Sequence, residues 1–235
     1  MRLNCLDVPA LAVAVSAAIA ILAGGASAGI TVVGLPGGDS EFSALTNNGT
    51  LERAVTEGRI GNNNASNGTW EHGIWEFGGV GGLKAQGGTT WASSTAIPFS
   101  VSYDGVSTIT FTQGSDVLSW NQMAGPFTDI FIRTRSARSD TTISLTSMSL
   151  SGFGALGTDL ITSGSGTVEY VRVANTSNFG AFTLSGMVSL AWSGSPPANS
   201  SLAYQVKLSN VVPAPSVAGG LGLGALMMMR RRRVG

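Results

Sequence analysis

Apolar and polar residues alternate with a period of two along most of residues 29–211, a pattern typical of half-buried β-strands. The clearest example has four apolar side chains on one face, Leu202, Tyr204, Val206 and Leu208. No long window keeps apolar residues at the 3.6-residue spacing of a helix. Residues 51–57 are the only stretch that fits a short helical turn, and they fit a strand equally well. The pattern therefore predicts an all-β fold.

Two strands depart from simple alternation. In residues 143–150 the apolar positions change parity between Leu145 and Met148, which predicts a β-bulge or a crossing between sheets. In residues 168–173 apolar side chains occupy both faces. We therefore expect this second strand to be covered on both sides.

One hairpin can be read in register around Asp104-Gly105. A two-residue loop at Asp-Gly is the usual choice, but it would turn Ile109 away from Val101. A three-residue loop pairs Val101 with Ile109 and Phe99 with Phe111, which places the apolar side chains on one face. The sequence thus predicts a connection of odd length, or a bulge.

Eight or nine short strands separated by Gly, Ser and Asn-rich turns predict a single β-sandwich with a jelly-roll-like arrangement over residues 29–211. A chain of about 180 residues is long enough for one hydrophobic core. We expect this domain to be flanked by a signal-peptide helix and a short C-terminal hydrophobic helix.

The N-terminal segment, residues 1–28, has the layout of a secretory signal peptide. Arg2 precedes an apolar run over residues 8–23, and Ala26-Ser27-Ala28 fits the small-x-small cleavage pattern. We expect Sec-type export and cleavage by signal peptidase, with a retained N-terminal anchor as the alternative. The single cysteine, Cys5, would leave with the peptide, which suits an oxidising exterior.

The C-terminal segment, residues 212–235, has three parts: Pro213-Ala214-Pro215, an uncharged stretch over 217–229, and the terminal arginines Arg230, Arg231, Arg232 and Arg233. As a helix the thirteen residues of 217–229 would be about 20 Å long. A bilayer core is about 30 Å thick. The segment is therefore a marginal stop-transfer sequence, with its arginines held in the cytoplasm and the main domain outside. It suits transient tethering, and a simple C-terminal anchor is the alternative.

This three-part layout resembles a PEP-CTERM sorting signal, with Ala214 in place of the usual glutamate. The resemblance implies cleavage by an exosortase-type membrane peptidase of Gram-negative bacteria. It also implies delivery to the cell surface or extracellular matrix, in an exopolysaccharide or biofilm layer. Residues 169–186 and the strand ending in Trp192-Ser-Gly-Ser resemble the choice-of-anchor domains, most closely type W. That group has no established catalytic residues to carry over.

Composition limits the chemistry. Charged residues are 11% of the chain and the formal net charge is zero, so there is no basic stripe to bind nucleic acid. Residues 29–211 hold 8 basic and 12 acidic side chains. The chain has one histidine, and no nucleophile-elbow, phosphate-loop or dinucleotide motif occurs. We therefore expect no enzymatic activity, no cofactor and no metal.

The densest group of polar and aromatic residues is 70–77. Trp70 and Trp75 could stack on sugar rings while Glu71 and His72 bind sugar hydroxyls, which would make the domain a carbohydrate-binding module for exopolysaccharide. A strand with one buried aromatic face explains the same residues. A glycosidase acid pair of Glu71 and Glu76 is disfavoured, because these residues would lie on opposite faces of one strand.

Two further groups of residues are candidates for ligand binding. Trp91 and Trp120 could extend an aromatic platform. Arg133, Arg135 and Arg138 form either a solvated face or a local site for an acidic polysaccharide. Taken together, the sequence predicts an exported, non-enzymatic protein with a structural or adhesive role.

Overall fold

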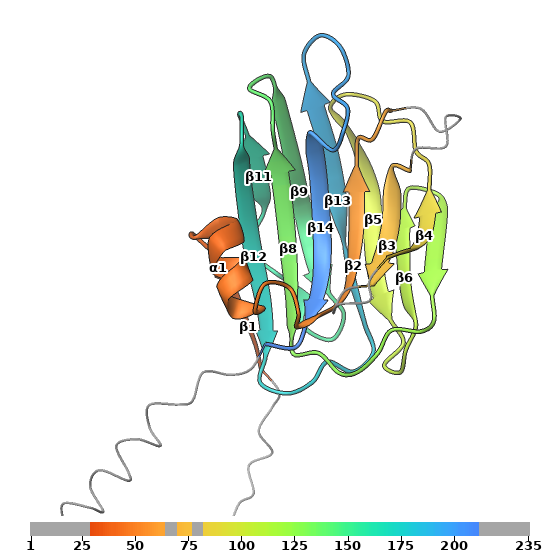
Figure 1. The fold of residues 1–235 in the computed structure, drawn as a ribbon, viewed down its shortest axis with the longest axis vertical. Coiled ribbons are helices and arrows are strands. Elements are labelled where there is room, and N and C mark those ends of the chain that lie inside the picture. Colours follow the sequence, from red (N-terminus) through yellow and green to blue (C-terminus); the bar gives the residue numbers. More distant parts are fainter. Residues whose placement is uncertain (1–28, 64–69, 77–81, 212–235) are drawn as a thin grey trace, which may run out of the picture.

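The computed structural model of the protein describes residues 29–63, 70–76 and 82–211. The expectations for residues 1–28 and 212–235 lie outside this described part. The described chain forms two antiparallel sheets that pack face to face, with a helix on the outer face of one of them (Figure 1). The prediction of an all-β fold is confirmed at this level.

Sheet 1 is the front layer in Figure 1. Its spatial order is β1 (Ile30–Gly34), β12 (Thr167–Asn175), β8 (Asp129–Ser136), β14 (Leu202–Ser209), β2 (Glu52–Arg59), β3 (His72–Glu76) and β4 (Leu83–Gly87). The last strand of the described chain, β14, thus lies in the middle of the sheet, between β8 and β2. Strand β2 also settles the ambiguous residues 51–57, most of which are extended.

Sheet 2 is the rear layer in Figure 1. Its spatial order is β10 (Gly154–Ala155), β9 (Thr141–Leu150), β13 (Phe182–Trp192), β5 (Thr95–Tyr103), β6 (Ile109–Gln113) and β7 (Asp116–Trp120), and β11 (Leu160–Ser163) also pairs with β9. The predicted bulge is present in β9: Ser147 and Met148 lie opposite the single residue Gly186, and Ser147 has a φ of 54°.

The main core lies between the sheets and is rich in aromatic rings. Tyr204 of sheet 1 is fully buried and packs against Phe99 and Phe111 of sheet 2, with ring centroids 5.2 and 6.2 Å apart. Burying an aromatic or large aliphatic side chain contributes roughly 1.5–3 kcal/mol. This shared core holds the two sheets together.

A smaller core lies on the outer face of sheet 1, beneath the helix α1 (Gly38–Leu45). Phe42 of the helix packs edge-on to Phe131 at 5.0 Å and stacks on Tyr170 at 5.2 Å. Strand β12 is therefore covered on both faces, as its sequence predicted. The helix itself was not predicted, because eight residues with one buried side chain show no helical periodicity.

The β5–β6 hairpin confirms the predicted face and corrects the predicted register. Tyr103 pairs with Ile109 and Val101 with Phe111, so the loop has five residues instead of three. Asp104 causes the difference. Its Oδ1 accepts hydrogen bonds from the backbone N–H groups of residues 106, 107 and 108 at 2.8–3.0 Å, which stabilises the longer odd-length turn.

The start of β1 and the end of β14 lie at the same end of sheet 1. Ile30 at the start of β1 lies opposite Asn175, and Ser209 at the end of β14 lies opposite Asp129. Because Asp129 pairs with Ala174 on its other side, these positions share one end of the sheet (Figure 1). Across the described ranges, no helix has the length and hydrophobicity required to cross a bilayer.

Candidate functional site

The residues predicted to bind a sugar, 70–77, mostly belong to β3, but two of them do not face a ligand. Glu71 and His72 are both fully buried. Side chains without solvent exposure cannot meet the hydroxyls of a surface-bound glycan. The expected roles of Glu71 and His72 in sugar binding are therefore corrected.

Glu71 instead holds the loop that follows β2. One carboxylate oxygen accepts the N–H of Gly61 at 2.5 Å, and the other accepts those of Asn62 and Asn63 at 3.0 and 2.8 Å. Hydrogen bonds to an ionised carboxylate are stronger than those between neutral groups. The side chain thus supplies acceptors for three consecutive backbone N–H groups of this partly buried turn.

His72 lies between the sheets. Its ring packs edge-on to Phe111, and Nε2 is 3.9 Å from a carboxylate oxygen of Asp116. Burial lowers the pKa of His72, and the nearby Asp116 opposes this shift only in part. The imidazole is therefore held neutral at physiological pH.

The tryptophans do not form a flat platform. Trp70 and Trp75 lie side by side with centroids 5.3 Å apart, but their planes are inclined by 65°. The Arg59 guanidinium covers Trp70 at 3.2 Å from its ring centroid. Trp91 and Trp120 are only 2% and 8% exposed. A coplanar and exposed set, the feature that would favour sugar stacking here, is not formed by these four residues.

The three arginines are not a cluster of free cations. Arg133 makes a two-point ion pair with Asp39 of α1, with both N···O distances 2.9 Å. Arg138 is paired with Asp140, and Arg135 is exposed. With two of the three neutralised by adjacent carboxylates, this strip offers little positive charge to an acidic polymer.

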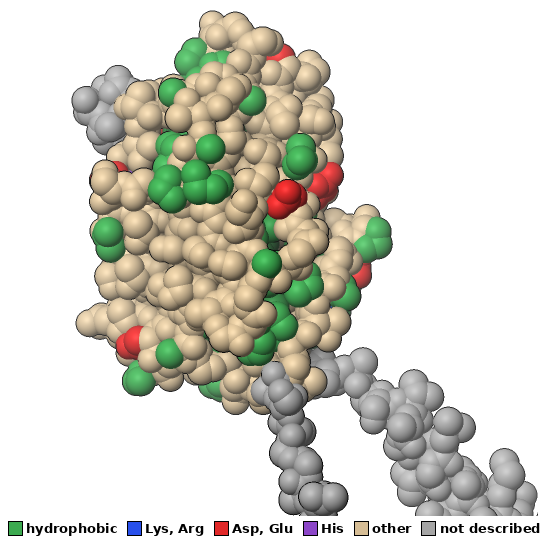
Figure 2. Space-filling view, turned by 180° about the vertical axis from the view of Figure 1, so that it is seen from behind, with side chains coloured by type: hydrophobic (Ala, Val, Ile, Leu, Met, Phe, Trp, Pro, Cys, Tyr) green, Lys and Arg blue, Asp and Glu red, His purple; other side chains and the backbone are tan. Residues whose placement is uncertain are grey.

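The two sheets differ sharply in charge. Every strand of sheet 1 except β1 contains at least one Lys, Arg, Asp or Glu, whereas among the strands of sheet 2 only β7 does, with Asp116. Figure 2 shows the molecule from the sheet 2 side. Tan surface dominates this face, hydrophobic side chains form small patches, and no Lys or Arg of the described residues is visible.

Hydroxyl groups take the place of charges on the outer face of sheet 2. The register aligns them in two rows that cross neighbouring strands. We call these the hydroxyl rows: Thr183, Ser102, Thr110 and Ser119 form the first, and Ser149, Ser185, Ser100 and Thr112 form the second. Adjacent strands lie about 4.8 Å apart, so the hydroxyls recur at regular spacing.

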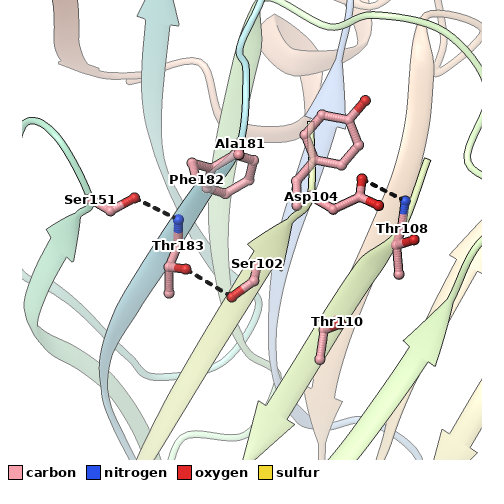
Figure 3. A pocket seen from close by; sticks show the side chains of 9 residues that line it. Ser102, Asp104, Thr108, Thr110, Ser151, Ala181, Phe182 and Thr183 are labelled. Atoms are coloured by element: carbon pink, nitrogen blue, oxygen red, sulfur yellow. Dashed lines mark hydrogen bonds between the residues drawn. The ribbon is translucent and has the colours of Figure 1, made fainter. Parts of the chain in front are cut away.

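A shallow hollow of about 310 Å³ is lined by three residues of the first hydroxyl row, Thr183, Ser102 and Thr110 (Figure 3). Ser102 and Thr183 share a hydrogen bond of 2.9 Å across its floor, and Ser151 Oγ accepts the Thr183 N–H at 2.8 Å. Thr110 and Asp104 line the opposite side. The volume is at the lower end of the range for small-ligand pockets, roughly 300–1,000 Å³.

The hollow is equipped for hydrogen bonding. Asp104 is its carboxylate, and bonds from three backbone N–H groups hold the pKa of Asp104 well below its usual range. A carboxyl that stays ionised at neutral pH accepts hydrogen bonds but cannot act as a general acid. A second hollow of about 340 Å³ adjoins the β9 bulge and is lined by Ser147, Thr158 and Asp159.

Sequence reasoning missed this face. The signal is present in the sequence, since strands β5, β6, β9 and β13 contain no charged residue, but the sequence alone does not show that these strands share one sheet. The described part of the chain contains no group of three or more His, Cys, Asp or Glu residues placed to hold a metal ion.

Comparison with protein-family models and with curated proteins finds no match to this chain. The sorting motif Pro213, Ala214 and Pro215, the arginines 230–233, and the cleavage residues Ala26 and Ala28 lie outside the described residues.

Proposed function

We propose that the chain is an exported, non-enzymatic protein of the bacterial surface or extracellular matrix, with a structural or adhesive role. The observation that carries this proposal is the combination of a signal-peptide pattern at residues 1–28 with the three-part tail at residues 212–235. An apolar stretch of thirteen residues capped by four arginines is too short for a comfortable span. It suits a sorting signal better than a lasting anchor.

In this proposal the two ends act in order. Sec-type machinery exports the chain and signal peptidase cuts after Ala28. The tail then inserts transiently in the inner membrane, with residues 230–233 in the cytoplasm, until an exosortase-type peptidase cuts near Pro213-Ala214-Pro215. A jelly-roll-like choice-of-anchor domain, and helices in the two terminal segments, are the finer structural expectations that belong to this proposal.

The described fold supports this arrangement. Ile30 and Ser209, near the two ends of the described chain, lie at the same end of sheet 1. A domain attached through that end leaves the outer face of sheet 2 free, whereas part of the outer face of sheet 1 is covered by α1. This is the geometry that a surface-displayed binding or structural unit requires.

Intact-mass analysis of the exported protein tests the proposal. We expect the loss of about 28 N-terminal residues and of the tail. Replacing all four terminal arginines with serine should prevent trimming and change the final location, because the positive charge that stops transfer is removed. The matched control replaces them with lysine, which keeps the charge. Unchanged export, trimming and location in the serine variant would overturn the proposal.

A further inference from the structure

We propose that the outer face of sheet 2, comprising the two hydroxyl rows and the adjoining hollow, is a binding surface for an uncharged polysaccharide. The inference names a ligand class for the adhesive role, so it rests on the proposed function. It places the site on the opposite layer from the tryptophan cluster of β3.

Charge selects the class of ligand. Strands β5, β6, β9 and β13 contain no Lys, Arg, Asp or Glu. Polyanions such as nucleic acids and acidic polysaccharides bind through Lys and Arg side chains that neutralise their charges. Residues 29–211 also carry more acidic than basic side chains, 12 against 8, so the field of the domain repels anions. An uncharged ligand needs no Lys or Arg side chains for binding, and the excess of acidic side chains does not repel it.

Hydroxyl density narrows the choice further. Each Ser or Thr hydroxyl is both a donor and an acceptor, and burying one without a partner costs roughly 1–3 kcal/mol. Within the rows Ser102 pairs with Thr183 and Ser149 with Ser185, but each hydroxyl keeps further donor or acceptor capacity, which an apolar partner or a lipid surface would leave unused. A sugar polymer presents its own hydroxyls at comparable density, so each buried group can find a partner.

The face also has apolar positions between the polar ones. Met187 pairs with Pro98 across β13 and β5, next to the second hydroxyl row. Sugar rings present C–H surfaces beside their hydroxyls, and such surfaces pack on apolar side chains. The hollow beside Ser102 and Thr183 adds a recess on the same face for one unit of the polymer (Figure 3). A row of hydroxyls across several strands suits an extended chain.

A second copy of the protein fits the face less well. Pairing two such faces would bury many short hydroxyls, and two independently fixed arrays would have to match in register. Burial of polar groups without good pairing is unfavourable. A flexible polymer can adjust its hydroxyls to the rows, whereas a second rigid sheet cannot.

The test uses the full chain purified in mild detergent. Binding is measured by co-sedimentation with cellulose and an insoluble β-1,3-glucan, by affinity electrophoresis in dextran and mannan, and with alginate as the acidic polymer. We expect retention by at least one neutral polymer, with less than a twofold change in Kd between 50 and 500 mM NaCl. We expect no retention by alginate at either salt concentration.

The variant that tests the face carries two substitutions, Thr110→Lys and Ser185→Lys. They change one position in each hydroxyl row, and the side chains of Thr110 and Ser185 are only partly buried. Bulky, strongly hydrated side chains there should weaken binding to the neutral polymer at least tenfold. The control is Thr31→Lys, on an exposed position of β1 in sheet 1, and should bind as the unaltered protein does. Thermal unfolding of each variant verifies that it is folded.

Four results would overturn the inference. The first is no retention by any neutral polymer, and the second is salt-sensitive binding to alginate alone. The third is equal binding by the double-lysine variant and the Thr31→Lys control. Sedimentation velocity shows whether the face instead joins two copies: a dimer that the double-lysine variant dissociates would also overturn the proposal. Export and trimming of the double-lysine variant should remain normal, which separates failure of this inference from failure of the proposed function.

Discussion

Removal of the Glu71 carboxylate should be among the most damaging single changes to this fold. The side chain is fully buried and accepts three backbone N–H bonds from residues 61–63. Leaving a buried donor unpaired costs roughly 1–3 kcal/mol, but the loop can relax and admit water. We therefore expect Glu71→Ala to lower the free energy of unfolding by about 3–5 kcal/mol, the lower part of the range for three unpaired donors.

Glu71→Gln gives a graded version of the same test. In the structure Oε1 accepts two of the N–H groups, those of Asn62 and Asn63, and Oε2 accepts that of Gly61. The glutamine oxygen can retain the first two bonds, while its NH₂ group would meet the Gly61 N–H as a second donor. We expect a loss of about 2 kcal/mol, intermediate between the original residue and alanine.

Urea unfolding of the exported protein, followed by tryptophan fluorescence, measures these differences. The control is Glu76→Ala at the end of β3, which removes a partly exposed ion pair with Lys84 and should cost no more than about 1 kcal/mol. A loss below about 1 kcal/mol for Glu71→Ala would show that the three bonds do not stabilise the loop. A glutamine variant as unstable as the alanine variant would refute the division of the bonds between the two oxygens.

Two further predictions concern His72 and Gly58, which contact side chains between the two sheets. Burial lowers the pKa of His72 in the folded protein. As the pH falls, His72 therefore becomes protonated in the unfolded chain before it does in the folded one, so the free energy of unfolding should decrease below about pH 6.5. His72→Gln should flatten that part of the stability profile, and a profile unchanged by the substitution would contradict the assignment. A Cβ at Gly58 would lie 2.3 Å from Tyr204 Cε1, so Gly58→Ala should cost about 1–3 kcal/mol in chemical unfolding. Gly180→Ala has open space and should be neutral; equal effects of the two would show that the core adjusts freely.

The strand pattern was largely predictable because alternation records which face is buried. Residues 99–111 show both the value and the limit of that signal. Their parity correctly places Val101 and Phe111 on the buried face, but the register depends on Asp104 capturing three backbone N–H groups. Side-chain bonds to a local turn leave no mark in hydrophobic periodicity.

Hydrophobic periodicity could not predict helix α1 or the burial of the Glu71 carboxylate. Helix α1 has eight residues and only Phe42 is buried in it, so its position is set by packing on Tyr170 and Phe131. Glu71 binds the backbone N–H of Gly61, which lies ten positions earlier in the chain. The sequence does not show that these two residues are close in space. The uncharged face of sheet 2 was visible in composition, but only the pairing of β5, β6, β9 and β13 assembles it into a surface.

The central place of β14 in sheet 1 constrains when the protein can fold. Leu202–Ser209 is the final strand of the described chain, yet it joins β8 to β2. Until those eight residues have been synthesised, the two halves of the sheet have no common neighbour and Tyr204 is missing from the core. The order of strands therefore delays closure of sheet 1 until β14 is available, and a chain that lacks β14 leaves one edge of β8 and one edge of β2 unpaired.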